Sequence, residues 1–137
     1  MIKVSKITFY FIKMLNNLLI LRRIKLYVNI WSGKRIIKIP ILNGIGYQNI
    51  FTREEWLDNI IRAIFQFKKG AFIDVGANLG QTLLKVISID ESREYFGFEP
   101  NLLCCYYVDE IIRKNRLSNH HILPCGLSKR NGGLKYF

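Results

Sequence analysis

The sequence is poor in acidic residues, in cysteine and in long hydrophobic runs. Its 137 residues include 21 Lys and Arg but only 10 Asp and Glu, which gives a formal net charge of +11. The shortage of acids is confined to the N-terminal half, where residues 1–70 hold 13 basic and 3 acidic residues, against 8 and 7 in residues 71–137. A positive excess suits nucleic acid or an anionic membrane surface, so any such contact belongs to the N-terminal half.

The three cysteines form no CxxC pair, and their odd number argues against a disulfide framework and for a reducing environment. The apolar stretch at residues 7–12 is interrupted by Lys13, Asn16 and Asn17, well short of the roughly 20 residues that span a bilayer. No small-residue cleavage site follows residues 18–21, so the stretch is also a poor signal peptide. We therefore expect a cytoplasmic protein without a transmembrane span.

Half of the residues are hydrophobic, so the chain should fold, and its length suits one compact domain.

Residues 1–70 are interpreted as a basic N-terminal extension. Residues 5–29 combine apolar clusters with five basic residues, which predicts a basic amphipathic helix that either packs on its own domain or binds an anionic membrane surface as a peripheral contact. Residues 35–41 predict a short strand, and turn residues follow at 43–46. Thr52 and Glu55 have the spacing of a capping box, which predicts a helix that ends at the basic residues and glycine of 68–70.

Residues 71–137 alternate strand and helix patterns with short loops between them. The hydrophobic pattern predicts strands at 71–75, 95–98 and 122–125, and helices at 80–88 and 102–116. This alternation is typical of an α/β fold with a doubly wound parallel sheet. Such folds bind ligands at the carboxyl ends of their strands, so the loops that follow the first two strands are the candidate site.

Two features of these loops predict a nucleoside site. Asp74 is followed by a turn with the sequence VGANLG, in which Gly76 and Gly80 allow positive φ and close approach of a ligand to the backbone. The free N–H groups of the helix that follows can receive a carboxylate or a phosphate. Glu99 ends the second strand, 19 residues after Gly80, where a carboxylate can accept hydrogen bonds from both hydroxyls of an adenosine ribose.

Asp74 distinguishes between two nucleoside cofactors. The pyrophosphate of a dinucleotide would meet like charge at this carboxylate, whereas the ammonium and sulfonium groups of S-adenosylmethionine would be attracted to it. The turn also lacks the full GxGxxG pattern of dinucleotide-binding proteins. S-adenosylmethionine is therefore the predicted cofactor, and an NAD-type oxidoreductase fragment is the alternative from this class of folds.

Three segments, FIDVGANLGQT at 72–82, FGFEPN at 96–101 and LPCGLS at 123–128, resemble the FkbM-type family of S-adenosylmethionine-dependent methyltransferases. The resemblance covers about residues 71–137 and implies a Rossmann-like class I fold and methyl transfer to an oxygen. It implies that the residues of the turn line the methionine end of the cofactor and that Glu99 holds the ribose. Asn101 either borders the adenine pocket or caps the next helix, and Cys125 falls where the family approaches the adenine ring. The candidate cofactor-binding residues are Asp74, Gly76, Ala77, Asn78, Gly80, Gln81, Glu99, Asn101 and Cys125.

A complete fold of this family resembles a seven-stranded sheet, and only about three of its strands can be found before Phe137. The chain is therefore interpreted as a truncated member or an N-terminal part of the domain, in which no catalytic residue can be named. The expected function is methyl transfer to the hydroxyl of a small molecule or a saccharide, and the alternative is a non-catalytic binding or interaction module. Nucleic acid is not the expected partner, because the basic segment lacks interleaved aromatic residues.

Several other conspicuous residues have simpler explanations. Cys104 and Cys105 fit a role as small core residues. Of Tyr106 and Tyr107, the one that faces inward is explained by packing. The pair at 120–121, His-His, has no cysteine or acid at ligand spacing, so we expect a loop or the start of a strand there and no metal site.

Overall fold

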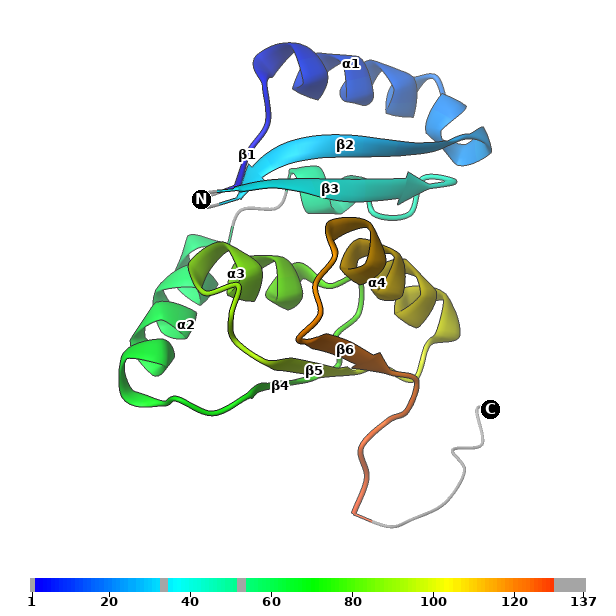
Figure 1. Cartoon of the computed structure of the whole chain (residues 1–137). Helices are drawn as coiled ribbons and strands as arrows, with labels where there is room; N and C mark the ends of the chain where they lie inside the picture. The colour runs from blue at the N-terminus through cyan, green and yellow to red at the C-terminus, as the bar shows by residue number, and fades with distance from the viewer. Residues whose placement is uncertain (1, 33–34, 52–53, 130–137) are drawn as a thin grey trace.

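The computed structural model describes residues 2–32, 35–51 and 54–129 of the chain. Within these ranges, six strands form two separate three-stranded sheets. Figure 1 shows the N-terminal sheet and helix α1 at one end of the molecule, the second sheet at the other end, and helices α3 and α4 between them. The chain has an α/β architecture.

The N-terminal sheet is antiparallel, in the order β1-β2-β3, with β1 at Ile2–Lys3, β2 at Lys25–Ser32 and β3 at Arg35–Leu42. Val28 lies opposite Ile39 and Ile30 opposite Ile37, and all four side chains are buried. Branched apolar residues of this kind are favoured in strands because they pack well on a pleated surface. The strand predicted at 35–41 and the turn at 43–46 are confirmed.

Helix α1 (Lys6–Asn17) begins at Ser5, whose hydroxyl accepts a hydrogen bond from the N–H of Thr8 at 3.1 Å. Leu19, with φ at 57°, ends the helical path, and a short 3-10 helix, η1 (Ile20–Arg23), leads into β2. The prediction of one helix over residues 5–29 is therefore wrong from residue 18 onward. Residues 26, 28 and 30 are apolar at every second position, and this alternation pairs β2 with β3 instead of continuing a helix.

The segment between the two sheets contains η2 (Tyr47–Ile50) and α2 (Glu55–Phe67). Thr52, the predicted cap of α2, lies outside the described residues, and Glu54 at the cap position makes no capping hydrogen bond through its side chain. Asp58 in the first turn of α2 accepts a hydrogen bond from Lys85 of α3 at 3.1 Å, which ties the two helices together. Helix α2 ends at Phe67, as predicted, and Lys68 is its C-cap residue.

The second sheet is parallel, in the order β4-β5-β6, with β4 at Phe72–Val75, β5 at Tyr95–Phe98 and β6 at His120–Leu123. Helix α3 (Gln81–Ile89) joins β4 to β5, and α4 (Leu102–Asn115) joins β5 to β6. The first two strands and both helices lie within a residue of their predicted positions. The third strand starts two residues earlier than predicted, so His120 begins it and Cys125 lies beyond its end.

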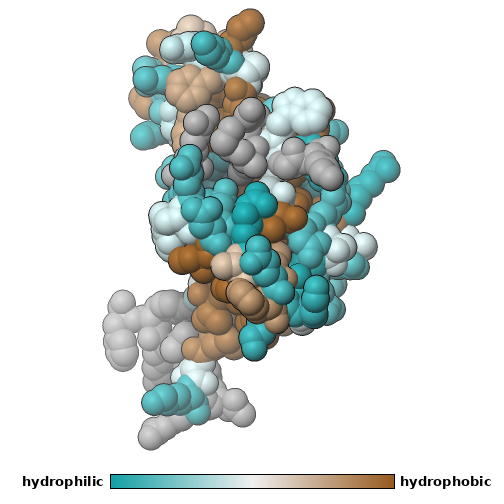
Figure 2. Space-filling model, turned by 90° about the vertical axis from the view of Figure 1, so that its left-hand side faces the viewer, coloured by the Kyte–Doolittle hydropathy of each residue, from teal (hydrophilic) through white to brown (hydrophobic). Residues whose placement is uncertain are grey.

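Only one face of this sheet is covered by helices in the described part of the chain. The rings of Phe72, Tyr95 and His120 stack in a row on one face, where Tyr95 and His120 are buried. Figure 1 shows α3 and α4 on one side of the sheet. On the other face, Ile73 and Val75 of β4 are 62% and 63% exposed. Figure 2 shows hydrophobic side chains gathered at the lower end of the body, at the height of this sheet in Figure 1. A doubly wound sheet needs helices on both faces, so that form stays a prediction.

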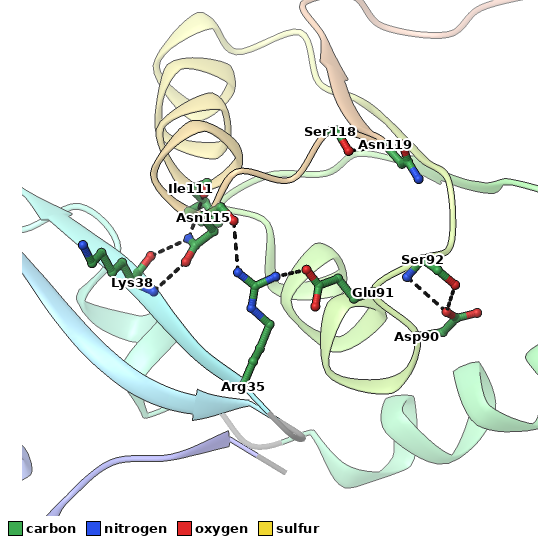
Figure 3. Close-up of polar contacts among 9 residues, drawn as sticks. All are labelled: Arg35, Lys38, Asp90, Glu91, Ser92, Ile111, Asn115, Ser118 and Asn119. Atoms are coloured by element: carbon green, nitrogen blue, oxygen red, sulfur yellow. Dashed lines mark hydrogen bonds and ion pairs between the residues drawn. The ribbon is translucent and has the colours of Figure 1, made fainter.

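Helix α4 joins the two sheets by hydrogen bonds to the free edge of β3. Asn115 accepts a hydrogen bond from the N–H of Lys38 at 2.7 Å and donates to its carbonyl at 2.8 Å. Arg35 contacts Glu91 after α3 and donates to the carbonyl of Asn115 at 3.0 Å (Figure 3). Further along the same edge, the Tyr107 hydroxyl donates to the Pro40 carbonyl. The backbone groups of an exposed strand edge are thus satisfied by side chains.

Candidate functional site

The predicted site residues lie at the carboxyl edge of the parallel sheet. The loop 76–80 follows β4, Glu99 follows β5 directly, and the segment from residue 124 follows β6. Hydrogen bonds hold these segments together, because Gly76 and Ala77 both donate to the carbonyl of Phe98 and Glu99 donates to that of Leu123. Parallel strands end at one edge of a sheet, so residues far apart in sequence meet there.

Glu99 binds the two loops beside it through its carboxylate. One oxygen accepts the N–H of Asn78 at 2.8 Å, and the other accepts the N–H of Asn101 at 2.9 Å. The side chain is only 8% exposed. A carboxylate offers about four acceptor positions, so about two remain for a further donor. Glu99 therefore has a structural role in the loops and also retains acceptor capacity for a ligand hydroxyl.

Asp74 lies half-buried on the helix-covered side of β4. The hydroxyl of Tyr95 donates to its carboxylate at 2.6 Å, and Thr82 of α3 also donates to it. Burial raises the pKa of Asp74 above its ordinary value, these two hydrogen bonds lower it, and repulsion from Glu99 raises it. Because the net shift is upward, the charged form of Asp74 is disfavoured in the fold unless a cation approaches.

Tyr95 is a site residue that reasoning from sequence missed. Its ring is fully buried and lies along β5, so that its hydroxyl reaches the strand next to it. Gly97 makes this possible, because a Cβ at that position would come within 3.0 Å of the Tyr95 ring and 2.9 Å of Ile122. The glycine between two phenylalanines in the FGFEPN segment could have signalled such a close approach.

The two glycines of the turn have different surroundings. Gly76 has φ at +86°, and a Cβ built there would meet no atom within 4 Å, so the backbone faces open space. Gly80 has φ at +74° and is buried, with its missing Cβ 3.2 Å from Val108 of α4. A ligand can therefore approach the turn at Gly76, whereas Gly80 serves the contact between the turn and α4. Ala77 is buried, and Gln81 is the first residue of α3.

Asn101 caps α4, and its side-chain oxygen accepts hydrogen bonds from the N–H groups of Leu103 and Cys104. The capping role, one of the two that the sequence left open, is thus confirmed. Cys105 is buried, as expected, and its thiol donates to the Glu99 carbonyl at 2.9 Å. Cys104 is half-buried, with its sulfur 3.6 Å from the side-chain oxygen of Asn78. Cys125 is exposed at the same edge of the sheet.

The remaining sequence candidates lie away from this edge. Tyr107 is the inward-facing tyrosine and Tyr106 is exposed, in agreement with the packing explanation. His120 and His121 begin β6, the expected start of a strand. A cavity of about 390 Å³, lined partly by Lys68, Lys69 and Arg93, lies at the amino end of β4, opposite the candidate site. In residues 2–32, 35–51 and 54–129, no three His, Cys, Asp or Glu side chains are grouped so that they could hold a metal ion.

The arrangement suits a cationic ligand better than an anionic one. Two carboxylates at the ends of neighbouring strands repel each other, and a positive group bound near them would relieve this repulsion. The open backbone at Gly76 gives the ligand an approach beside Asp74. Comparisons of the chain with protein-family models, curated proteins and solved structures find no match. The family and its activity therefore remain proposals that depend on the residues of the site.

Proposed function

We propose that the chain binds S-adenosylmethionine at the carboxyl edge of β4 and β5 and acts in methyl transfer to a hydroxyl oxygen. The main support is the pair of carboxylates, Asp74 and Glu99, that end neighbouring strands on either side of an open glycine turn. A doubly wound class I methyltransferase sheet, of which β4-β5-β6 would be one part, belongs to the same proposal.

The two carboxylates of the site have defined tasks in this proposal. Asp74 attracts the ammonium group of the cofactor, and Tyr95 and Thr82 hold its carboxylate in place. Glu99 accepts hydrogen bonds from the ribose with the acceptor positions that Asn78 and Asn101 leave free. When bound, S-adenosylmethionine supplies a methyl group on a sulfonium centre. Methyl transfer depends mainly on alignment of the acceptor with that group, so the chain's contribution is to position the cofactor.

A non-catalytic binding module is the second candidate. Glu99 favours it in one respect, because both of its carboxylate oxygens already accept backbone hydrogen bonds and the side chain is nearly buried. This candidate predicts cofactor binding without methyl transfer to any hydroxyl compound. The acceptor would be a small molecule or a saccharide in the catalytic case, and a screen of such acceptors separates the two.

The test is calorimetric titration of the wild-type protein and Asp74→Asn with S-adenosylmethionine. Asparagine keeps the size and an acceptor for Tyr95 but removes the charge. We expect binding to weaken roughly tenfold or more, equivalent to about 1.4 kcal/mol. Burial disfavours the charge that this substitution removes, so the variant should fold, and circular dichroism checks that it does.

Asp109→Asn is the matched control, because it makes the same charge change on the partly exposed side of α4 and should leave binding unchanged. Absence of heat with folded wild-type protein would contradict the proposal. Tighter binding of NAD than of S-adenosylmethionine would also overturn it and favour the oxidoreductase alternative.

A further inference from the structure

Helix α1 presents apolar side chains on two different faces. Ile12 is buried in the core, and Leu15, one turn further, packs against it. A second row, offset from the first around the helix, points to solvent at spacings of four, three and four residues. Its members are Ile7, Phe11, Met14 and Leu18, with exposed fractions between 49% and 84%. One face is enough to attach the helix to its own domain, so the second row has no partner in the described part of the chain.

Basic side chains border this exposed row. Lys6 and Lys13 are exposed on α1 next to it, and Arg22, Arg23 and Lys25 are exposed just after the helix. The sequence has no acidic residue before Glu54. None of these five cations has a carboxylate within ion-pair distance among the residues that the structure describes. The surface around α1 is therefore both apolar and positively charged.

We propose that α1 docks in the plane of an anionic lipid bilayer, with its exposed apolar row in the interface and the surrounding basic residues on the lipid headgroups. An apolar row beside a basic face is typical of helices that lie in such an interface. A helix of 12 residues is about 18 Å long at about 1.5 Å per residue, too short to cross the hydrocarbon core. In line with this, the described residues contain no helix long and apolar enough to span a membrane.

The composition of the row favours lipid over nucleic acid. Three of its four members are aliphatic or a thioether, and such side chains offer an RNA base no stacking surface. Figure 1 shows α1 on the far side of the N-terminal sheet from β4-β5-β6. Docking through α1 would thus leave the carboxyl edge of the parallel sheet free, and the proposal does not depend on the proposed function.

The test is co-sedimentation of the whole protein with two kinds of vesicle, one of phosphatidylcholine alone and one of equal parts phosphatidylcholine and phosphatidylglycerol. We expect binding to the anionic vesicles that falls as salt rises. The double variant I7Q/F11Q should weaken this binding roughly tenfold or more. Both side chains are exposed, so the variant should fold, which circular dichroism checks.

Matched controls distinguish binding through this surface from nonspecific adsorption to vesicles. W56Q/F67Q removes two exposed aromatic residues from α2 and should bind vesicles as the wild type does. K6Q/K13Q should weaken binding more than K68Q/K69Q, which makes the same charge change at exposed positions after α2. The proposal would be overturned if W56Q/F67Q weakened binding as much as I7Q/F11Q does. It would also be overturned if K68Q/K69Q weakened binding as much as K6Q/K13Q does. Binding to single-stranded RNA without binding to vesicles would overturn it as well, as would a dimer that I7Q/F11Q dissociates in a protein that does not bind vesicles.

Discussion

His120 is a buried histidine whose environment disfavours its charged form. It is 3% exposed, it stacks on Tyr95, and neither ring nitrogen has a hydrogen-bond partner in the described residues. Burial lowers the pKa of His120, and the nearby His121 and Arg35 lower it further. The folded protein therefore holds this imidazole neutral, whereas the unfolded chain protonates it near the ordinary value of about 6.5.

This difference predicts acid sensitivity. Because the unfolded state binds the proton more tightly, the contribution of His120 to stability is full above about pH 7.5 and is lost as pH falls below about 6.5. The loss for one group approaches about 1.4 kcal/mol per pH unit. Urea unfolding between about pH 5.5 and 7.5, roughly one unit either side of the histidine pKa, measures it. His120→Phe should flatten the pH dependence, and His121→Phe, on the exposed face of β6, should flatten it much less, because burial is the main cause of the shift. The reverse result would show that the assignment to His120 is wrong.

At the scale of elements, α4 connects the two sheets. It packs on the parallel sheet through residues of its buried face, and through Asn115 and Tyr107 it satisfies the backbone of β3. Gly46 allows this contact, since a Cβ there would overlap the Tyr107 hydroxyl. The N-terminal sheet is thus attached to the α/β part by specific hydrogen bonds in addition to apolar packing.

Asn115→Ala should cost about 2–3 kcal/mol of unfolding free energy. The substitution leaves the N–H and the carbonyl of Lys38 without their side-chain partner, in a site where Asn115 itself is buried. Asn29→Ala, at an exposed position of β2, is the control and should cost less than about 0.5 kcal/mol. Equal costs in urea unfolding would mean that the edge of β3 is satisfied by other groups.

Much of the α/β part could be predicted because its signals are local. Strands at 71–75 and 95–98 and the helices after them follow from short hydrophobic patterns, and the shared edge of parallel strands brings Asp74 and Glu99 together. Strand β2 could not be predicted, because no proline or glycine separates its alternating apolar residues from the helical pattern of the residues before them. The contact of Asn115 with Lys38 joins residues 77 positions apart, and the reach of Tyr95 across Gly97 depends on a side-chain path. Neither contact produces a recognisable pattern in the neighbouring sequence.

At the scale of the molecule, the two ends differ in chemistry. One end carries α1 with its basic and apolar surface, and the other carries the parallel sheet with an uncovered apolar face (Figures 1 and 2). Residues from both sheets, from α1 and from α3 and α4 belong to one apolar core. Stability should therefore depend on isoleucines of this core and much less on those of the uncovered face.

Two isoleucines in strands test this distribution. Ile37 of β3 is fully buried and Ile73 of β4 is 62% exposed, so both variants make the same chemical change in a strand but in different surroundings. Ile37→Ala should lower the unfolding free energy by about 3 kcal/mol through lost burial and a cavity. Ile73→Ala should lower it by about 1 kcal/mol or less, since little apolar area leaves contact with protein. Urea unfolding at low protein concentration gives both values. If Ile73→Ala costs as much as Ile37→Ala, the outer face of the parallel sheet is covered in solution.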